Sequence, residues 1–332
     1  MGDIYFMNKE LILTLLNIPK VSRKTINYIL SEEYDLELNI EQIVNVFECC
    51  RNKNKRIPLI GREDIRKANE IAKLIIQECD KLEIGILSIL DDDFPTNLKV
   101  INDNPVILFH KGNKSCLYEE KSVAIIGTRK PSEHGLKIAH RLGYLFGSDD
   151  YVVVSGLAKG CDELGHLGCV EAKGRSVAVL PCGLDTIYPA SNKKLAKNIL
   201  DNGGCLVSEY QIGTKPYKNL FVDRDRLQSA LSAGIVVVEA SKSSGTMYTV
   251  EYAKAQNKVV GCYKHKDDFE NKETISGNIE VLKNKDTFSI EGPESLAIFK
   301  EALLNNDIVE KKDKVTSNEE SKEQITFDFT GC

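Results

Sequence analysis

Residues 122–135 read SVAIIGTRKPSEHG, and the architecture of the chain can be worked out from this stretch. Its first five residues are mostly apolar and β-branched, as in a buried strand, and an amphipathic pattern from Leu136 to Phe146 indicates a helix. The loop between them carries glycines and the cations Arg129 and Lys130. Such a loop presents backbone N–H groups to an anion at the helix N-terminus, and the basic side chains strengthen the positive field. The stretch predicts an anion-binding turn, although an ordinary turn with exposed cations would read the same.

The alternation of strand and helix patterns continues along the chain. Short, valine-rich apolar runs are typical of strands covered on both faces, and they predict strands at Val123–Ile126, Tyr151–Ser155, Ser176–Leu180, Cys205–Ser208, Ile235–Glu239 and Lys258–Gly261. Amphipathic patterns between them predict helices at Gly135–Phe146, Leu164–Ala172, Lys193–Asn202, Arg224–Ser232 and Thr246–Gln256. Strands that are each followed by a crossover predict an α/β fold with a doubly wound, mainly parallel sheet. Ligands of such sheets bind outside the carboxyl ends of the strands, so the loops at that edge hold the candidate site.

The segments on either side of this sheet have different patterns. Residues 1–80 are helical in pattern, and we expect a small helical N-terminal domain, helix-hairpin-helix or SAM-like, before the sheet domain at residues 81–304. Ser22 is a suitable N-cap for a helix that ends at Leu30. The turn before it lacks the glycines with which a helix-hairpin-helix approaches phosphate, which favours a packing role. Residues 305–332 are charged and poor in apolar side chains, which predicts a disordered tail. Weaker patterns predict helices at Ile40–Cys50, Arg62–Ile76 and Pro293–Leu304, and strands at Leu82–Ser88, Pro105–Phe109 and within Glu280–Phe288.

The composition limits the classes of partner. The formal net charge is -5, so contact with nucleic acid requires a local basic patch rather than the charge of the whole chain. The ten cysteines are scattered and form no C-x-x-C pair, so we expect reduced thiols in a cytoplasmic protein rather than disulfides or a zinc site. No signal-type segment occurs and no apolar stretch approaches ~20 residues, so we expect no membrane partner.

The loops after the predicted strands supply amides, hydroxyls and cations. The second loop, SGLAKGCD at Ser155–Asp162, has two glycines that permit close approach of the backbone, and Lys159 adds charge. The third loop places Tyr188 ahead of Lys193 and Lys194. An aromatic ring beside cations suits single-stranded nucleic acid, although a ring packed in a turn explains Tyr188 equally well.

The starts of the helices complete the rim of the sheet. We expect Asp162 and Asp223 as N-caps, and His166 as a packed, hydrogen-bonded histidine on the inner face of its helix. Two arginines in a later helix and a hydroxyl-rich turn before the next helix face the same rim. The residues expected to bind single-stranded DNA or phosphate are Gly127, Thr128, Arg129, Ser132, Ser155, Gly156, Lys159, Gly160, Tyr188, Lys193, Lys194, Arg224, Arg226, Ser244 and Gly245.

Motifs of several enzyme classes are missing from the sequence. It contains no G-x-x-x-x-G-K-[ST] loop, no G-x-G-x-x-G run, no G-x-S-x-G elbow and no His/Cys cluster with metal-ligand spacing. The loops also offer no nucleophile beside a base. We therefore expect a binding protein with no catalytic residue, no cofactor and no metal.

Six motifs resemble those of the DNA-processing protein DprA family, also called Smf, in their order and spacing. They are GTRKPS at Gly127–Ser132, VSGLAKGCD at Val154–Asp162, CGLDTIYP at Cys182–Pro189, SEY at Ser208–Tyr210, FVDRDR at Phe221–Arg226 and SSGTMYT at Ser243–Thr249. The resemblance implies a Rossmann-like domain that binds and protects incoming single-stranded DNA, forms a homodimer and helps to load a RecA-type recombinase in natural transformation. The family's binding positions fall on Arg129, Ser155–Gly160, Lys193, Lys194 and Arg224–Arg226.

Some positions depart from the family pattern and suggest a divergent member. Asp225 stands where the family usually has asparagine, which places a carboxylate where a phosphate or base of the strand is expected. Cys262–His265 replaces a usual proline-glycine, and the charged tail stands in place of a frequent winged-helix-like domain.

Two other hypotheses stay open at this point. The chain could be a nucleotide-binding or nucleotide-hydrolysing Rossmann-like enzyme or sensor, for example in phage defence. Against hydrolysis of a nucleotide, Glu251 lies one helical turn too far along the chain from Gly245 and Thr246 to act with them. A scaffold that acts through its tail and dimer surface is the third hypothesis.

Overall fold

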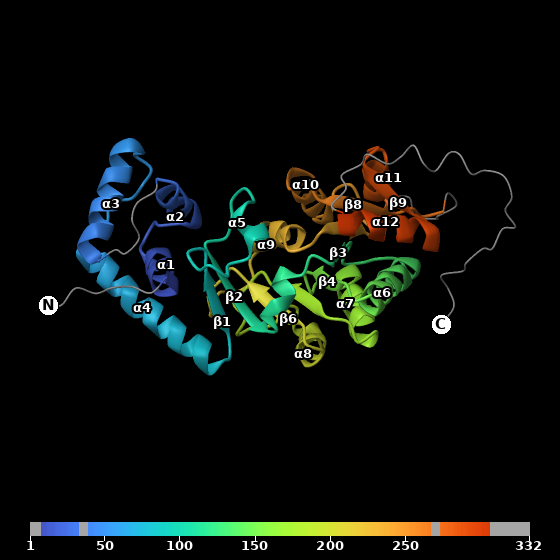
Figure 1. Cartoon of the computed structure of the whole chain (residues 1–332), viewed down its shortest axis with the longest axis horizontal. Helices are drawn as coiled ribbons and strands as arrows, with labels where there is room; N and C mark the ends of the chain where they lie inside the picture. The colour runs from blue at the N-terminus through green and yellow to red at the C-terminus, as the bar shows by residue number, and fades with distance from the viewer. Residues whose placement is uncertain (1–7, 33–38, 267–272, 306–332) are drawn as a thin grey trace, which may run out of the picture. The chain divides into compact units, whose positions relative to one another are not determined.

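The computed structural model describes residues 8–32, 39–266 and 273–305, and these form two compact units. The first unit contains the described residues up to Lys111 and two later segments, Cys182–Thr186 and Val207–Lys215. The second contains Gly112–Pro181, Ile187–Leu206 and the described residues from Pro216 onward. Figure 1 colours the elements in chain order. The expected tail lies outside the described residues from position 306 onward.

Helices dominate the first unit. Its elements are α1 Asn8–Asn17, α2 Arg23–Leu30, α3 Ile40–Lys53, α4 Arg62–Lys81, β1 Gly85–Ser88, α5 Thr96–Lys99 and β2 Ile107–Gly112. The predicted cap is confirmed, because Ser22 Oγ accepts a hydrogen bond from Thr25 N at 3.3 Å. The apolar faces of α1 and α4 pack against each other, and Ile12 and Ile65 are fully buried. The unit continues past residue 80 into the antiparallel pair of β1 and β2.

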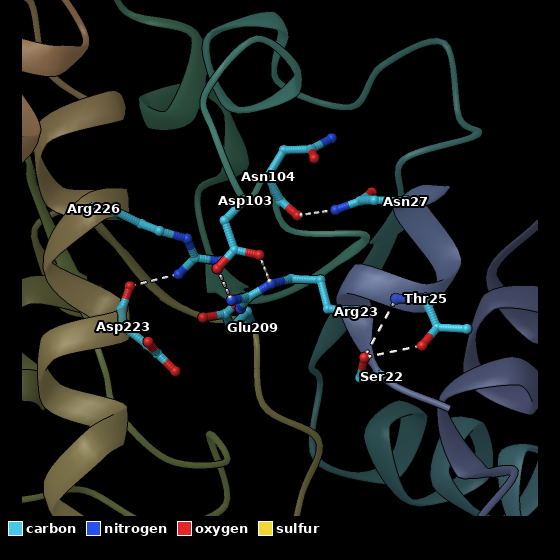
Figure 2. A network of polar contacts seen from close by, with 9 residues as sticks. All are labelled: Ser22, Arg23, Thr25, Asn27, Asp103, Asn104, Glu209, Asp223 and Arg226. Atoms are coloured by element: carbon cyan, nitrogen blue, oxygen red, sulfur yellow. Dashed lines mark hydrogen bonds and ion pairs between the residues drawn. The ribbon is translucent and has the colours of Figure 1, made fainter. Parts of the chain in front are cut away.

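An ion-pair network fixes α2 within the first unit (Figure 2). Arg23 Nε donates to Asp103 Oδ1 at 3.1 Å, and Arg23 Nη1 donates to Glu209 Oε2 at 2.5 Å. Asn27 Nδ2 donates to the carbonyl oxygen of Asn104 at 2.9 Å. Burial alone would lower the pKa of Arg23, but the two carboxylates raise it overall. Through Glu209, the SEY run therefore forms an ion pair with α2 across 186 positions of the sequence.

A parallel sheet forms the core of the second unit. Its strands are β3 Ser122–Ile126, β4 Val152–Ser155, β5 Ser176–Val179, β7 Gly234–Val237, β8 Val259–Tyr263 and β9 Thr287–Ile290, and β6 Cys205–Ser208 begins in this unit and ends in the first. They lie in the order β6-β5-β4-β3-β7-β8-β9, and each pairing from β5 to β9 is parallel. Val123 of β3 pairs with Val153 on one side and Gly234 on the other. The strand order reverses beside β3, so the crevice for a ligand is expected at the carboxyl end of that strand.

Helices connect the strands of this sheet. They are α6 Glu133–Ser148, α7 Cys161–Glu171, α8 Lys193–Asp201, α9 Lys218–Ala230, α10 Thr246–Ala255, α11 Ser276–Leu282 and α12 Pro293–Asn305, with short 3₁₀ turns at Lys114–Tyr118 and Ala190–Asn192. Figure 1 shows α6 and α7 side by side next to β3 and β4. Gly143 permits this contact, because a Cβ there would lie 2.1 Å from the carbonyl oxygen of Gly165. The predicted doubly wound α/β fold with a helical N-terminal region is confirmed.

Several boundaries differ from the sequence prediction, among them the start of α7, which is at Cys161 rather than Leu164. Helix α9 begins at Lys218 rather than Arg224, so Asp223 lies inside the helix and is not its N-cap. The segment Glu280–Phe288, expected to hold a strand, begins within α11 and reaches only the start of β9. None of the helices in the described part of the chain combines the length and apolar character that crossing a membrane requires.

Candidate nucleic-acid interface

A carboxylate of the chain itself occupies the N-terminus of α6. Glu239 follows β7 and is fully buried. Its Oε1 accepts a hydrogen bond from Ser132 N at 3.1 Å, and its Oε2 accepts one from Ser132 Oγ at 2.7 Å. Ser132 Oγ caps α6 by accepting from Gly135 N at 3.0 Å, and Thr128 N donates to the backbone oxygen of Glu239 at 2.7 Å. The sequence predicted an external anion here. Glu239 takes that place instead, because a helix N-terminus stabilises a nearby negative charge.

The glycine loop after β4 packs against the loop after β3. Gly160 has a φ of 85°, and a Cβ on it would lie 2.6 Å from the carbonyl oxygen of Thr128, so the position requires glycine. Ser155 is fully buried, and its Oγ donates to the carbonyl oxygen of Ile125 at 2.6 Å. Lys159 is exposed on this loop. These contacts fix the backbone of the loop, and the side chain of Lys159 is exposed to solvent.

Two polar residues of α7 have structural roles. Gly160 is the N-cap of α7, so Asp162 lies in the first turn, and its Oδ2 accepts a hydrogen bond from Gly156 N at 3.1 Å. His166 is fully buried, as predicted, with Nδ1 2.6 Å from Ser176 Oγ. Burial lowers the pKa of His166 to about 3, so the imidazole is neutral.

Arg224 and Arg226 lie inside the protein, whereas the sequence placed them at an exposed rim. Arg224 is 3% exposed, and its guanidinium lies so close to Gly156 that an added Cβ there would be 1.9 Å from Nη1. It also donates to the carbonyl oxygen of Val179 at the end of β5. Arg226 is 2% exposed, and its Nη1 donates to the carbonyl oxygen of Asp223 (Figure 2). Arg224 and Arg226 point in nearly opposite directions, about 200° apart around α9, and both are buried because this part of the helix is covered on several sides, as the burial of residues 226–230 shows.

One cation and two aromatic rings form a row that we call the platform: Arg129, Phe221 and Tyr188. The guanidinium carbon of Arg129 lies 4.8 Å from the centroid of the Phe221 ring. The centroids of the Phe221 and Tyr188 rings are 5.5 Å apart, and their planes meet at 67°. Tyr188 is 41% exposed, Arg129 is exposed and Phe221 is half-buried. The platform therefore offers a charge for a phosphate and ring surfaces for bases.

The loops around the platform are tied together. Asn192 Nδ2 donates to the carbonyl oxygen of Leu157 at 3.0 Å, which joins the loop that carries Tyr188 to the glycine loop. Lys193 and Lys194 are the first residues of α8, and both are exposed. The loops after β3, β4 and β5 thus bring exposed cations to the carboxyl ends of neighbouring strands.

Phe221 was not among the residues expected from the sequence. Reasoning from charge selected the arginines of the FVDRDR motif and passed over the ring at its start. A signal was available: Leu220, Phe221 and Val222 are consecutive, and three successive positions of a helix cannot all face the core.

The remaining expected residues occupy other places in the second unit. Gly127 packs against α7, because a Cβ there would lie 2.4 Å from Cys161 Sγ. Ser244 and Gly245 form the turn before α10, in which Ser244 N donates to the carbonyl oxygen of Ser241 at 3.0 Å. The same turn is linked to the start of α11 by a 2.9 Å hydrogen bond from Lys242 N to Ser276 Oγ. That Ser244 and Gly245 contribute to binding single-stranded DNA or phosphate stays a prediction.

The chain is similar in sequence to curated DNA processing proteins. The DprA protein of Streptococcus pneumoniae is 39% identical over 173 residues, which cover 52% of this chain and 60% of that protein. The DprA protein of Bacillus subtilis is 36% identical over 177 residues, which cover 53% and 59%. The matched region therefore spans about three fifths of the length of these relatives.

Solved structures and a family model also show similarity to DNA processing proteins. The X-ray structure of DprA from S. pneumoniae matches with a TM-score of 0.72 and 26% identity, over 89% of this chain and 98% of that one. A structure of DprA from Helicobacter pylori, described for its single-stranded DNA binding mode, matches with a TM-score of 0.58 and 27% identity, over 68% and 97%. The family model for DNA recombination-mediator protein A matches residues 85–299, which is more than half of the chain. The chain therefore belongs to the DNA recombination-mediator protein A family.

Proposed function

We propose that this protein binds single-stranded DNA on the platform and acts as a recombination mediator rather than as an enzyme. The observation that carries the proposal is the row of Arg129, Phe221 and Tyr188, with centroid distances of 4.8 and 5.5 Å. Aromatic faces stack on bases that are not paired, and a neighbouring guanidinium neutralises the backbone. The exposed Lys159, Lys193 and Lys194 extend this positive surface, which a chain of net charge -5 must supply locally.

The biological role is proposed from membership of the family. We propose that the bound protein protects an incoming strand and helps to load a RecA-type recombinase in natural transformation. We also propose that it works as a homodimer in the cytoplasm, where thiols stay reduced.

A nucleotide-hydrolysing activity has less support. Glu251 is exposed and pairs with Lys254 on the same helix at 3.0 Å. The donors at the start of α6, where a nucleotide phosphate would be held, bind Glu239.

The test is a fluorescence-anisotropy titration of a labelled oligo-dT with the full-length protein. Stacking on an aromatic side chain contributes ~1–3 kcal/mol per base, so Phe221→Ala should weaken binding by roughly fivefold to a hundredfold. Arg129→Ala should weaken binding and also reduce the slope of log K against log salt by about 0.7, the value for one phosphate of a single strand.

A second exposed pair on α6 provides the matched controls. Arg141 lies 6.0 Å from the Tyr144 ring centroid, and both residues are exposed. Arg141→Ala and Tyr144→Ala should leave oligo-dT binding unchanged. The proposal fails if the wild type shows no affinity for oligo-dT at low salt. It also fails if the control pair and the platform variants lose affinity equally.

A further inference from the structure

Four ionisable groups interact with one another, and we call them the quartet: Arg129, which also belongs to the platform, and Arg224, Asp162 and Asp225. Arg224 Nε lies 3.2 Å from Asp225 Oδ1, and the two side chains are 4% and 13% exposed. Asp225 Oδ1 also accepts a hydrogen bond from Gln228 Nε2 at 2.7 Å. Arg129 interacts electrostatically with both carboxyl groups, as does Arg224. Two guanidinium groups are thus coupled to two carboxyl groups, of which Arg224, Asp162 and Asp225 are largely shielded from water and Arg129 is exposed.

The charge on Asp225 depends on groups from three elements. Burial raises the pKa of Asp225 to about 7; among its neighbours Arg224 lowers it most, Asp162 raises it, and Arg129 and Gln228 lower it. Arg224 and Gln228 belong to α9, Asp162 to α7 and Arg129 to the loop after β3. Near neutral pH the carboxyl of Asp225 therefore exchanges readily between its two forms.

We propose that Asp225 determines the affinity of the platform for single-stranded DNA by taking up a proton when a strand binds. The inference rests on the proposed function and adds a regulation to the same site. If both carboxyl groups of the quartet are ionised, they balance the two guanidinium groups. Protonation of Asp225 leaves one positive charge without a counter-charge beside the exposed Arg129. A phosphate bound at Arg129 adds negative charge next to the quartet and so stabilises the protonated form of Asp225.

The direction of the pH dependence follows from this linkage. Binding raises the affinity of Asp225 for a proton, so a falling pH strengthens DNA binding by the same factor. The affinity changes with pH above the pKa of Asp225 in the free protein, which is about 7, and it becomes constant about one pH unit below that pKa. Each unit by which the bound strand raises that pKa corresponds to a tenfold change in affinity.

The experiment is an oligo-dT titration of the full-length protein between about pH 6 and about pH 9 at constant ionic strength. Wild type should bind about tenfold more weakly at the alkaline end than near pH 6.5. Asp225→Asn should bind more tightly than wild type at the alkaline end, and its affinity should vary less with pH; burial also raises the pKa of Asp162, which stays in this variant. Burial lowers the pKa of His134 and His265, so these imidazoles do not change charge in the alkaline half of this range.

Two further variants separate Asp225 from a general charge effect and from a folding defect. Asp223→Asn removes one negative charge from the same helix outside the Arg224 pair, and it should keep the wild-type pH dependence. Gln228→Met removes the donor that stabilises the ionised Asp225, so the weakening should move to a higher pH. This second variant keeps the test decisive if Asp225→Asn fails to fold.

The outcomes distinguish the inference from the proposed function. A wild-type affinity that does not change with pH would overturn the role of Asp225 and leave the platform proposal intact. The same holds if Asp225→Asn keeps the wild-type slope, or if Gln228→Met does not move it. If wild type binds no oligo-dT at any pH, the proposed function itself fails.

Discussion

Replacing Glu239 by glutamine removes the negative charge at the N-terminus of α6 and keeps the shape of the side chain. The carboxylate accepts hydrogen bonds from Ser132 N at 3.1 Å and Ser132 Oγ at 2.7 Å. Hydrogen bonds to a charged group contribute ~1.5–3 kcal/mol each, and a partly buried charge at a helix end adds up to ~2 kcal/mol. Glutamine keeps one acceptor oxygen. We therefore expect Glu239→Gln to lower the free energy of unfolding by about 2–5 kcal/mol, the sum of one such bond and the helix interaction.

The assay is urea unfolding followed by far-ultraviolet circular dichroism. Glu133→Gln is the matched control, because Glu133 is an exposed glutamate in the first turn of the same helix. It should cost less than about 1 kcal/mol of the free energy of unfolding. Ser132→Ala combined with Glu239→Gln should be non-additive by at least ~0.5 kcal/mol, since the two side chains share a hydrogen bond. Equal losses for Glu239→Gln and Glu133→Gln, or additive effects in the double variant, would refute the assignment of Glu239 as an internal anion.

Two further predictions concern Gly156 in the glycine loop and His166 in α7. Gly156→Ala should displace the Arg224 guanidinium, because the new Cβ would lie 1.9 Å from Nη1. We expect a loss of more than ~2 kcal/mol in the free energy of unfolding, while Gly245→Ala, with open space around its Cβ, should be nearly neutral. His166 has a pKa lowered from 6.5 to about 3, so as the pH falls below 6.5 the unfolded state binds a proton that the folded state excludes. The free energy of unfolding of wild type should therefore fall by up to about 4 kcal/mol as the pH drops from 6.5 towards 3. His166→Gln should flatten this decline. A decline of the same steepness in both proteins would contradict the conclusion that His166 is buried and neutral.

The sheet could be predicted because its strands carry their own signal. Val123, Val153 and Val236 are fully buried, and strands covered on both faces must be apolar throughout. The start of α9 lacked such a signal, since Lys218 and the residues after it are exposed or half-buried and show no buried face. Periodicity therefore located the buried half of α9 but not its first turns, where the run of three apolar residues at Leu220–Val222 was the one signal for Phe221.

The site was harder to predict than the sheet, because charged groups near a glycine loop have two kinds of partner. A cation or a helix N-terminus there can bind an external phosphate, or it can bind a group of the chain that is distant in sequence. Glu239 reaches Ser132 across 107 positions, and Arg224 reaches Val179 across 45. Neither pairing leaves a local pattern in the sequence. The affinity for a ligand must come from the groups that stay exposed after the internal pairs have formed. Arg129 meets that condition, and it contacts the Phe221 ring. We therefore expect a single strand to bind on the platform and not at the N-terminus of α6.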